Sequence, residues 1–456
     1  MIPIPRREFV HGLGFRMLGL GLSNLSALAG PRADAEGPAG FGRVKHCIFL
    51  FLYGGLRSLI RRERMTKRNV STVFFATQVA VAMAILMAGS EDLRAQPLFT
   101  SQDLFISGHD NVNIYRIPSL IVSPKGTILA FCEARQGDDG DPTNLVLKRS
   151  LFEDPPSQPR NLNGYPRTFG YGVNWQSMQV VLAGKGEAIM QPCPVVDRTT
   201  GEILICCQEI RGGLANLLKN EWHGRCLILS SVDDGVTWSS PREITESVGH
   251  FAAGPGIGIQ LKSGRLVIPG YSKDGARCIF SDDHGKTWRA GTPVKNKGCN
   301  ESQVVELSDG SLLMNMRQGG RRRYVALSKD QGETWLKENN EESLPDPGCQ
   351  ASILRFPNRA AGARDLLLFA NPPHPAPFEA RTNLTVRLSD DDGQTWKASR
   401  EVDPGPGAYS SLAVLADGST IGLLYETGEK HPYEKIAFVR FNLEWLTTTP
   451  KSNTGN

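Results

Sequence analysis

An eight-residue motif with the frame Ser-x-Asp-x-Gly-x-Thr-Trp occurs four times and constrains the fold more than any other feature. Its copies begin at Ser231, Ser281, Ser328 and Ser389, so the starts lie 50, 47 and 61 residues apart. The frame is typical of a tight hairpin turn, because Asp can accept backbone N–H bonds across the turn and Gly adopts φ > 0 without strain. We expect Thr and Trp to begin the outgoing strand, with the Trp ring covering the turn. The spacing is too long for one hairpin and fits a four-stranded propeller blade.

From Ala95 onward the chain consists of short apolar runs separated by Gly, Pro, Asp and Asn, with almost no helical period. Such runs are typical of strands, so the sequence predicts an all-β fold. The clearest predicted strands cover residues 119–123, 127–131, 203–207, 265–268, 311–316 and 365–369. Residues 151–175 lie where a further copy of the turn would fall, and we interpret them as an insertion that replaced it.

The four turns are similar to the Asp boxes of sialidase-like propellers. This resemblance implies an all-β, six-bladed β-propeller, and a propeller commonly uses a chain of this length as one domain. We place the propeller at residues 96–447, followed by a disordered tail at 448–456. Asp boxes also occur in propellers that are not enzymes, so they do not identify an activity.

The first 95 residues contain two export signals in series. Arg6 and Arg7, followed by a Gly- and Leu-rich run, resemble a twin-arginine signal, and the start of an unrelated exported bacterial family is similar to residues 40–55. The second signal, at residues 65–95, has a basic start, an apolar core and a small final residue. A second signal normally begins a chain, so we interpret residues 1–64 as a fused leader or a misplaced start.

This reading predicts an exported protein, periplasmic or secreted, with Met65 as initiator and a mature chain that begins near Gln96. The alternative is that residues 73–89 stay uncleaved as a membrane anchor, although 17 residues are marginal for spanning a bilayer.

Charge and cysteine content exclude other classes of function. The net charge of +4 is small and the basic residues are dispersed, so we expect no nucleic-acid partner. The basic run at residues 321–323 is interpreted as a solvated blade edge. Nine cysteines show no metal-ligand spacing, and Cys206 and Cys207 lie in an apolar run that indicates core packing. We expect a monomer with no metal and no organic cofactor.

The resemblance becomes functional at Arg116, because the run Tyr-Arg-Ile-Pro-Ser that contains it is similar to the start of sialidase catalytic domains. Sialidases bind a sugar that carries a carboxylate on its anomeric carbon, and guanidinium groups can engage a carboxylate bidentately. The family uses three arginines for this anion. Arg116, Arg317 and Arg381 stand in matching contexts, so the resemblance implies that these three bind the substrate carboxylate.

A carboxylate nucleophile would be repelled by the substrate's own carboxylate, and tyrosine avoids this repulsion. Tyr409, within Gly-Pro-Gly-Ala-Tyr-Ser-Ser-Leu, matches the family's nucleophile. Glu301 matches the base that a phenol of pKa about 10 requires at neutral pH. Glu426 resembles the acid that holds the first arginine, and Arg135 resembles a further arginine of the site; for these two, an ordinary salt bridge within a blade is the alternative.

The residue that protonates the leaving oxygen is expected in the segment Gly-Asp-Asp-Gly-Asp at residues 137–141. Counting back from the following strand indicates Asp139, whereas counting forward from Arg116 indicates Asp141. We prefer Asp139, because a loop tip tolerates a deletion better than a strand register does. Asp138 is the next candidate.

Taken together, the resemblance implies a retaining exo-α-sialidase that acts on sialylated glycans, glycoproteins or glycolipids. Two alternatives remain open at this point. One is a non-catalytic carbohydrate-binding propeller, which would keep the turns and lose the Arg, Tyr and Glu set. The other is a glycosidase or transglycosidase for a related nonulosonic acid, because the pocket for the C5 substituent cannot be recognised in the sequence.

Overall fold

The computed structural model describes residues 96–151, 173–213, 224–319, 321–358, 364–374 and 381–448. The chain divides into two compact units, Met1–Arg94 and Ala95–Asn456, and the described residues all belong to the second. The predictions for residues 1–64 and 65–95, and for the tail after Thr448, fall outside the described residues and stay predictions. Within the described ranges, no helix combines the length and the apolar character needed to cross a membrane.

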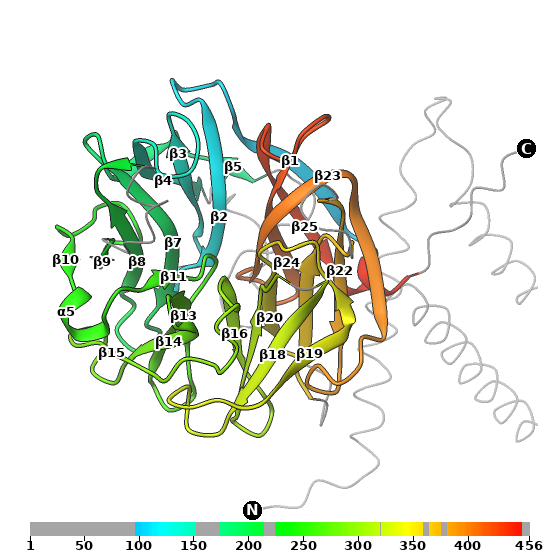
Figure 1. Ribbon diagram of the computed structural model, residues 1–456. Helices are drawn as coiled ribbons and strands as arrows, with labels where there is room; N and C mark the ends of the chain where they lie inside the picture. The colour runs from blue at the N-terminus through cyan, green and yellow to red at the C-terminus, as the bar shows by residue number, and fades with distance from the viewer. Residues whose placement is uncertain are drawn as a thin grey trace, which may run out of the picture. The chain divides into compact units, whose positions relative to one another are not determined.

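The described strands form six antiparallel blades that follow one another around a common axis, from cyan β2 through green and yellow to orange β23 and red β25 (Figure 1). The innermost strands are in contact from blade to blade. Strand β2 contacts β7 on one side and β23 on the other, so the ring closes where the first and last blades meet. The predicted six-bladed β-propeller is therefore confirmed.

The first three blades are built from strands that are adjacent in sequence. The first blade comprises β2 (Ile114–Val122), β3 (Ile128–Arg135), β4 (Thr143–Leu151), β5 (Asn174–Trp175) and β6 (Gln179–Leu182). The second comprises β7 (Ala188–Val196), β8 (Ile203–Ile210), β9 (Arg225–Ser231) and β10 (Arg242–Glu243). After helix α5 (Thr245–Val248), the third comprises β11 (Ala252–Ala253), β12 (Ile259–Gln260), β13 (Leu266–Ser272), β14 (Gly275–Ser281) and β15 (Arg289–Ala290).

Of the last three blades, the fifth and sixth share one long strand, β23 (Ala398–Val414), and the sixth ends on the N-terminal strand β1 (Phe99–Ile106). The fourth blade comprises β16 (Ser302–Glu306), β17 (Leu312–Met316), β18 (Arg322–Ser328) and β19 (Leu336–Pro345). The fifth comprises β20 (Ser352–Phe356), β21 (Leu366–Asn371), β22 (Thr382–Ser389) and the first half of β23, which pairs with β22. The sixth comprises the second half of β23, β24 (Thr420–Thr427), β25 (Lys435–Asn442) and β1.

The core is divided into six main hydrophobic clusters, one between each pair of neighbouring blades. Both faces of a blade are therefore buried, and every residue of β3, for example, is buried. This is why the strands appear in the sequence as continuous apolar runs rather than as alternating patterns. All six of the clearest predicted strands are present.

In the second to fifth blades, each Asp box connects the last two strands of its blade. In the copy at Ser281, the Asp283 carboxylate accepts the Thr287 N–H at 2.9 Å and the Thr287 hydroxyl at 2.6 Å. Gly285 has φ of +79°, as predicted, and lies so close to Leu204 that a Cβ atom would come within 2.3 Å of the leucine side chain. The predicted strand start was wrong, because Thr287 and Trp288 lie in the turn and β15 begins one residue later.

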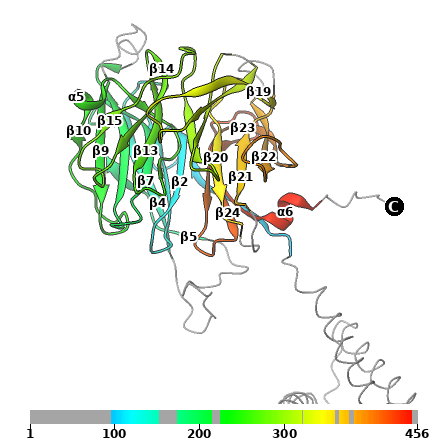
Figure 2. The ribbon, with the colours of Figure 1, turned by 90° about the horizontal axis from the view of Figure 1, so that it is seen from below.

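The two blades without a box differ for separate reasons. In the first blade, the connection from β4 to β5 runs through residues 152–172, which fall outside the described residues and include most of the predicted insertion. In the sixth blade, β25 and β1 are paired but come from opposite ends of the propeller sequence, so no turn joins them (Figure 1). Helix α6 (Leu443–Thr447) follows β25 and is drawn in red in Figure 2. Its Trp445 stacks on Phe99 of β1.

One interpretation of a charged segment was wrong. Arg321 is exposed and Arg322 half-buried, but Arg323 is 0% exposed. Its guanidinium donates to Asn315 at 2.7 Å and lies 3.4 Å from the equally buried Asp346. The alternation of a strand explains the difference, since successive side chains point to opposite faces. By contrast, the core packing predicted for Cys206 and Cys207 is confirmed, because both are buried in β8.

Candidate active site

Four β-bulges lie at the same end of the propeller, and each adjoins a side chain of the predicted site or its surroundings. They interrupt the pairing after Arg116 in β2, after Met190 in β7, after Thr382 in β22 and after Gly407 in β23. At the first bulge Ile117 has φ of +60°, which costs a β-branched residue about 1–3 kcal/mol. A β-bulge changes the direction of the neighbouring side chains. The four bulges therefore direct side chains from different blades toward one region.

Glu426 of β24 joins the first of these bulges to the fourth. Its carboxylate accepts the Arg116 Nε–H and the Ile117 N–H through Oε1, at 2.7 and 2.8 Å, and the Tyr409 N–H through Oε2 at 3.1 Å. Glu426 is 0% exposed, so these three N–H donors take the place of water around its carboxylate. The carboxylate thus fixes the strained bulge that carries Arg116 and the backbone that carries Tyr409.

Tyr409 lies between a carboxylate and a guanidinium. Its hydroxyl donates to Glu301 Oε1, and Arg317 Nη1 donates to the hydroxyl at 2.8 Å and to Glu301 Oε2 at 2.7 Å. Burial raises the pKa of Tyr409 well above its usual range, and the charge of Glu301 raises it further, against the opposing effect of Arg317 and Arg381. The phenol is therefore protonated in the free protein, with an acceptor already in contact.

Arg381 approaches Tyr409 from another blade and is held by two groups. Its Nη1 donates to Tyr433 Oη at 2.8 Å, its Nη2 donates to the Gly348 carbonyl at 2.9 Å, and its guanidinium carbon lies 5.6 Å from the Tyr409 ring centre. Arg116 lies 5.4 Å from the same ring centre and 3.6 Å from that of Tyr433. The three arginines therefore surround one tyrosine.

The buried pair of Arg323 and Asp346 is connected to this cluster through residues 346–349. Asp346 begins the turn that leads to Gly348, and the Arg323 guanidinium donates to the carbonyl of Cys349 at 2.5 Å. The pair therefore holds the turn whose Gly348 carbonyl contacts Arg381.

The two candidate acids, Asp139 and Asp141, have different surroundings in the structure. Asp139 forms an ion pair with Arg135 and its side chain is 60% exposed. Burial of its carboxyl group raises the Asp139 pKa, but Arg135, Arg116 and Arg317 together hold it below its ordinary value. Asp141 instead accepts the Asp138 N–H at 2.8 Å and so closes its own loop. Of the two, Asp139 is the carboxylate that faces the arginines.

Three further residues at this cluster were not recognised in the sequence. Tyr433 comes from the loop between β24 and β25, where no motif marks it. Gln191 lies in the bulge of β7, and its Nε2 donates to Tyr271 Oη at 2.8 Å. Glu133 forms an ion pair with Arg135. The sequence could have predicted this contact, because residues two apart in a strand point to the same face.

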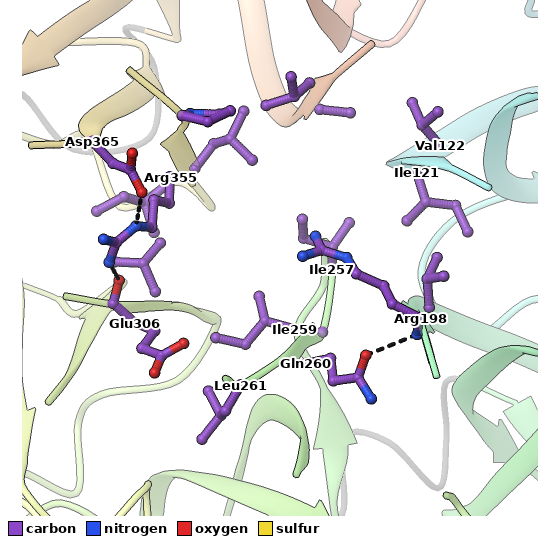
Figure 3. A pocket seen from close by; sticks show the side chains of 18 of the residues that line it. Ile121, Val122, Arg198, Ile257, Ile259, Gln260, Leu261, Glu306, Arg355 and Asp365 are labelled. Atoms are coloured by element: carbon purple, nitrogen blue, oxygen red, sulfur yellow. Dashed lines mark hydrogen bonds and ion pairs between the residues drawn. The ribbon is translucent and has the colours of Figure 1, made fainter. Parts of the chain in front are cut away.

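A cavity of about 550 Å³ lies at the opposite end of the inner strands (Figure 3). It is lined by the later residues of these strands, such as Val122 of β2, whereas Arg116 lies near the start of β2. Isoleucine and leucine side chains form much of its wall, and the Arg198 side chain extends toward Ile257 (Figure 3). None of the predicted site residues lines this cavity, so the charged cluster around Tyr409 is the candidate active site.

Comparisons with known proteins agree with this geometry. The family model described as "BNR repeat-like domain" matches residues 126–423. The chain is 36% identical over 426 residues to a sialidase of Micromonospora viridifaciens, an alignment that covers 86% of this chain and 61% of that protein. It is 30% identical to Sialidase-3 of Bos taurus, covering 72% of this chain and 89% of the relative. A solved structure, Hadza microbial sialidase Hz136, aligns with a TM-score of 0.65 at 28% identity, covering 76% of this chain and 69% of that one.

Proposed function

This chain belongs to the sialidase family of glycoside hydrolases, and from that premise we propose that it is a retaining exo-α-sialidase acting through a tyrosyl-glycosyl intermediate. The observation that carries the proposal is the contact of the Tyr409 hydroxyl with both Glu301 and Arg317. A propeller that only bound carbohydrate would not require a buried phenol with a base and a cation on the same oxygen.

The three arginines support recognition of an anion next to the bond that is cleaved. Arg116 is oriented by Glu426, Arg317 by Glu301, and Arg381 by Gly348 and Tyr433. Guanidinium groups fixed in this way lose little further freedom when they bind a carboxylate. The substrate carboxylate is therefore held beside Tyr409, with the anomeric carbon facing the phenol oxygen.

In the first step the Tyr409 oxygen attacks the anomeric carbon, and the phenol proton moves to Glu301. The glycosidic bond breaks as Asp139 protonates the leaving oxygen. In the second step Asp139 removes a proton from a water molecule, which displaces the phenol oxygen, and Glu301 returns its proton to Tyr409. Two displacements at one carbon retain the anomeric configuration. Arg317 stabilises the negative charge that develops on the phenol oxygen.

The nucleophile is tested by Tyr409→Phe, with Tyr425→Phe as the matched control. Tyr425 is also buried, but its hydroxyl contacts Asp403 rather than the cluster. We expect Tyr409→Phe to lose several orders of magnitude in kcat on a sialylated oligosaccharide while it still binds a dehydrated sialic-acid analogue. NMR of the first wild-type product should show the α-anomer. Near-wild-type turnover by Tyr409→Phe would remove this residue from the mechanism.

The acid is tested by changing the leaving group. An aryl glycoside whose leaving group has a pKa near 8 departs largely without a proton, whereas a sugar alkoxide does not. Asp139→Ala should therefore lose on the order of 10²-fold more activity on the oligosaccharide than on the aryl glycoside. Asp141→Ala should lose little on either, and the reverse pattern would assign the acid to Asp141.

The same assays address the alternatives. Hydrolysis of a deaminated substrate in preference to the N-acyl one would indicate a related nonulosonic acid, and a sialylated acceptor as main product would indicate transfer. We further propose that the protein is exported after cleavage near Gln96 and meets sialylated glycoconjugates as a monomer. N-terminal sequencing of protein from its native host tests the cleavage, and recovery of a species that begins before Met65 would contradict the misplaced start.

A further inference from the structure

Glu133 is a buried carboxylate that takes no part in the proposed bond changes. We propose that it is a positioning residue, which holds the Arg135 guanidinium against Asp139 and offsets part of its positive charge. The inference rests on the proposed function, because it treats Asp139 as the proton donor.

Arg135 is a bridge between two carboxylates with different surroundings. Glu133 and Arg135 are both buried on one face of β3, and Arg135 Nε donates to Glu133 Oε2 at 2.7 Å, with Nη2 2.5 Å from the same oxygen. The other terminal nitrogen, Nη1, donates to Asp139, whose side chain is largely exposed. The Arg135 guanidinium is therefore fixed by the buried Glu133 on one side and contacts the exposed Asp139 on the other.

Glu133 is itself held by the next blade. Its Oε1 accepts the Gln191 N–H at 2.5 Å, and Gln191 has φ of +57° in the bulge of β7. The Gln191 side chain continues the contact to Tyr271 of β13. The position of Glu133 is therefore fixed by the second blade and not by the loop that carries Asp139.

The charges around Asp139 come from several elements. Arg135 on β3, Arg116 on β2 and Arg317 after β17 are positive. Glu133 is the buried carboxylate behind Arg135, and its ion pair with Arg135 favours its charged form. Tyr271 of β13 is also near, because its pKa is raised first by burial, then by the charge of Glu301, and to a smaller extent by that of Asp139. Burial raises the Glu133 pKa, Arg135 opposes this, and the charge of Asp139 raises it further. A Coulomb interaction is mutual, so the charge of Glu133 likewise raises the pKa of Asp139.

The signs of these charges determine in which direction the Asp139 pKa changes when Glu133 loses its charge. Without the Glu133 charge, Arg135 stabilises the Asp139 carboxylate more strongly and the Asp139 pKa falls. A proton donor must be protonated, so the pH above which kcat/KM declines moves down. This decline in kcat/KM is expected for a substrate whose leaving group is a sugar. It is not expected for an aryl glycoside, because the aryl leaving group needs no proton.

The experiment compares Glu133→Gln with Glu133→Asp and with Asp197→Asn as a matched control. Asp197 is a fully buried carboxylate of the second blade that pairs with His284, at the far end of β7 from Gln191. We expect Glu133→Gln to lower the alkaline limb of kcat/KM on a sialylated oligosaccharide by roughly 1 pH unit. At pH values above that limb, kcat/KM of Glu133→Gln on the oligosaccharide should be about tenfold lower than that of the wild type. Its kcat/KM on the aryl glycoside should be nearly unchanged. Glu133→Asp should move the limb back toward wild type, and Asp197→Asn should leave it in place.

If Glu133→Gln does not fold, the double variant Glu133→Gln with Arg135→Met removes both buried charges together and leaves neither unpaired. Asp139 then loses a positive neighbour, so the alkaline limb should lie above that of the wild type. An equal loss on both substrates, or a limb that stays in place, would overturn the inference and indicate a merely structural role. If Asp139→Ala loses activity equally on the oligosaccharide and the aryl glycoside, the assignment of Asp139 as the acid is wrong as well. The Asp139→Ala assay therefore distinguishes failure of the proposed function from failure of the role of Glu133.

Discussion

Tyr433 joins two of the three arginines, because its ring lies against Arg116 and its hydroxyl accepts from Arg381. Tyr433→Phe keeps the ring contact and removes the hydrogen bond to the charged group. We expect this variant to bind the dehydrated analogue roughly three- to tenfold more weakly, and Tyr433→Ala to bind it more weakly still. Calorimetric titration of both variants, with Tyr425→Phe as control, measures this. Equal affinities for Tyr433→Phe and Tyr433→Ala would show that the ring contributes nothing.

The lowered pKa of Asp139 also predicts two different pH profiles. In the free enzyme the arginines favour the Asp139 carboxylate, and a bound substrate carboxylate offsets their charge, so the pKa rises in the complex. The profile of kcat/KM reports the free enzyme and that of kcat reports the complex. On a sialylated oligosaccharide, kcat should therefore persist to higher pH than kcat/KM. Coincident alkaline limbs would contradict this account of the acid.

At the scale of the element, Asp boxes stabilise the blade edges through backbone conformation and close packing together. Gly285→Ala would meet both obstacles, since φ is +79° and Leu204 is buried against the turn. Gly186 is the matched control, because its φ is +98° but the space beside it is open. We expect Gly186→Ala to cost about 1 kcal/mol of stability and Gly285→Ala about 1–3 kcal/mol more. Thermal unfolding of the two variants measures the difference, and equal Tm values would mean that packing adds nothing.

At the scale of the whole molecule, the sixth blade is completed by the N-terminal strand β1, which pairs with β25 and buries Leu104 and Phe105. A chain that starts at Gln96 should keep the fold and the activity, because it retains this strand. A chain that starts after Ile106 loses the outer strand of the sixth blade and exposes the edge of β25. We expect it to aggregate or to unfold at a markedly lower temperature. Equal Tm values and activities for the two chains would show that the fold does not depend on β1.

The sequence by itself determined the features that adjacent residues encode. An Asp box is specified within eight residues, because its Asp accepts hydrogen bonds from its Thr and its Gly adopts the positive φ that the turn requires. The apolar runs predicted strands because both faces of each blade are buried, and the spacing of the boxes predicted the size of a blade. Arg116, Tyr409 and Glu301 could be predicted as site residues because each lies in a short segment that resembles a family motif.

Only the tertiary structure decided how residues of different blades meet. The loop of Asp139 and Asp141 offered two candidates by counting, and the direction in which each carboxylate points depends on Arg135 and on the loop's own hydrogen bond. The basic run that ends at Arg323 looked exposed because its buried partner, Asp346, lies 23 residues further along the chain. Tyr433 and Gln191 reach the cluster through a loop and a bulge. Such contacts join residues far apart in sequence, so no local pattern encodes them.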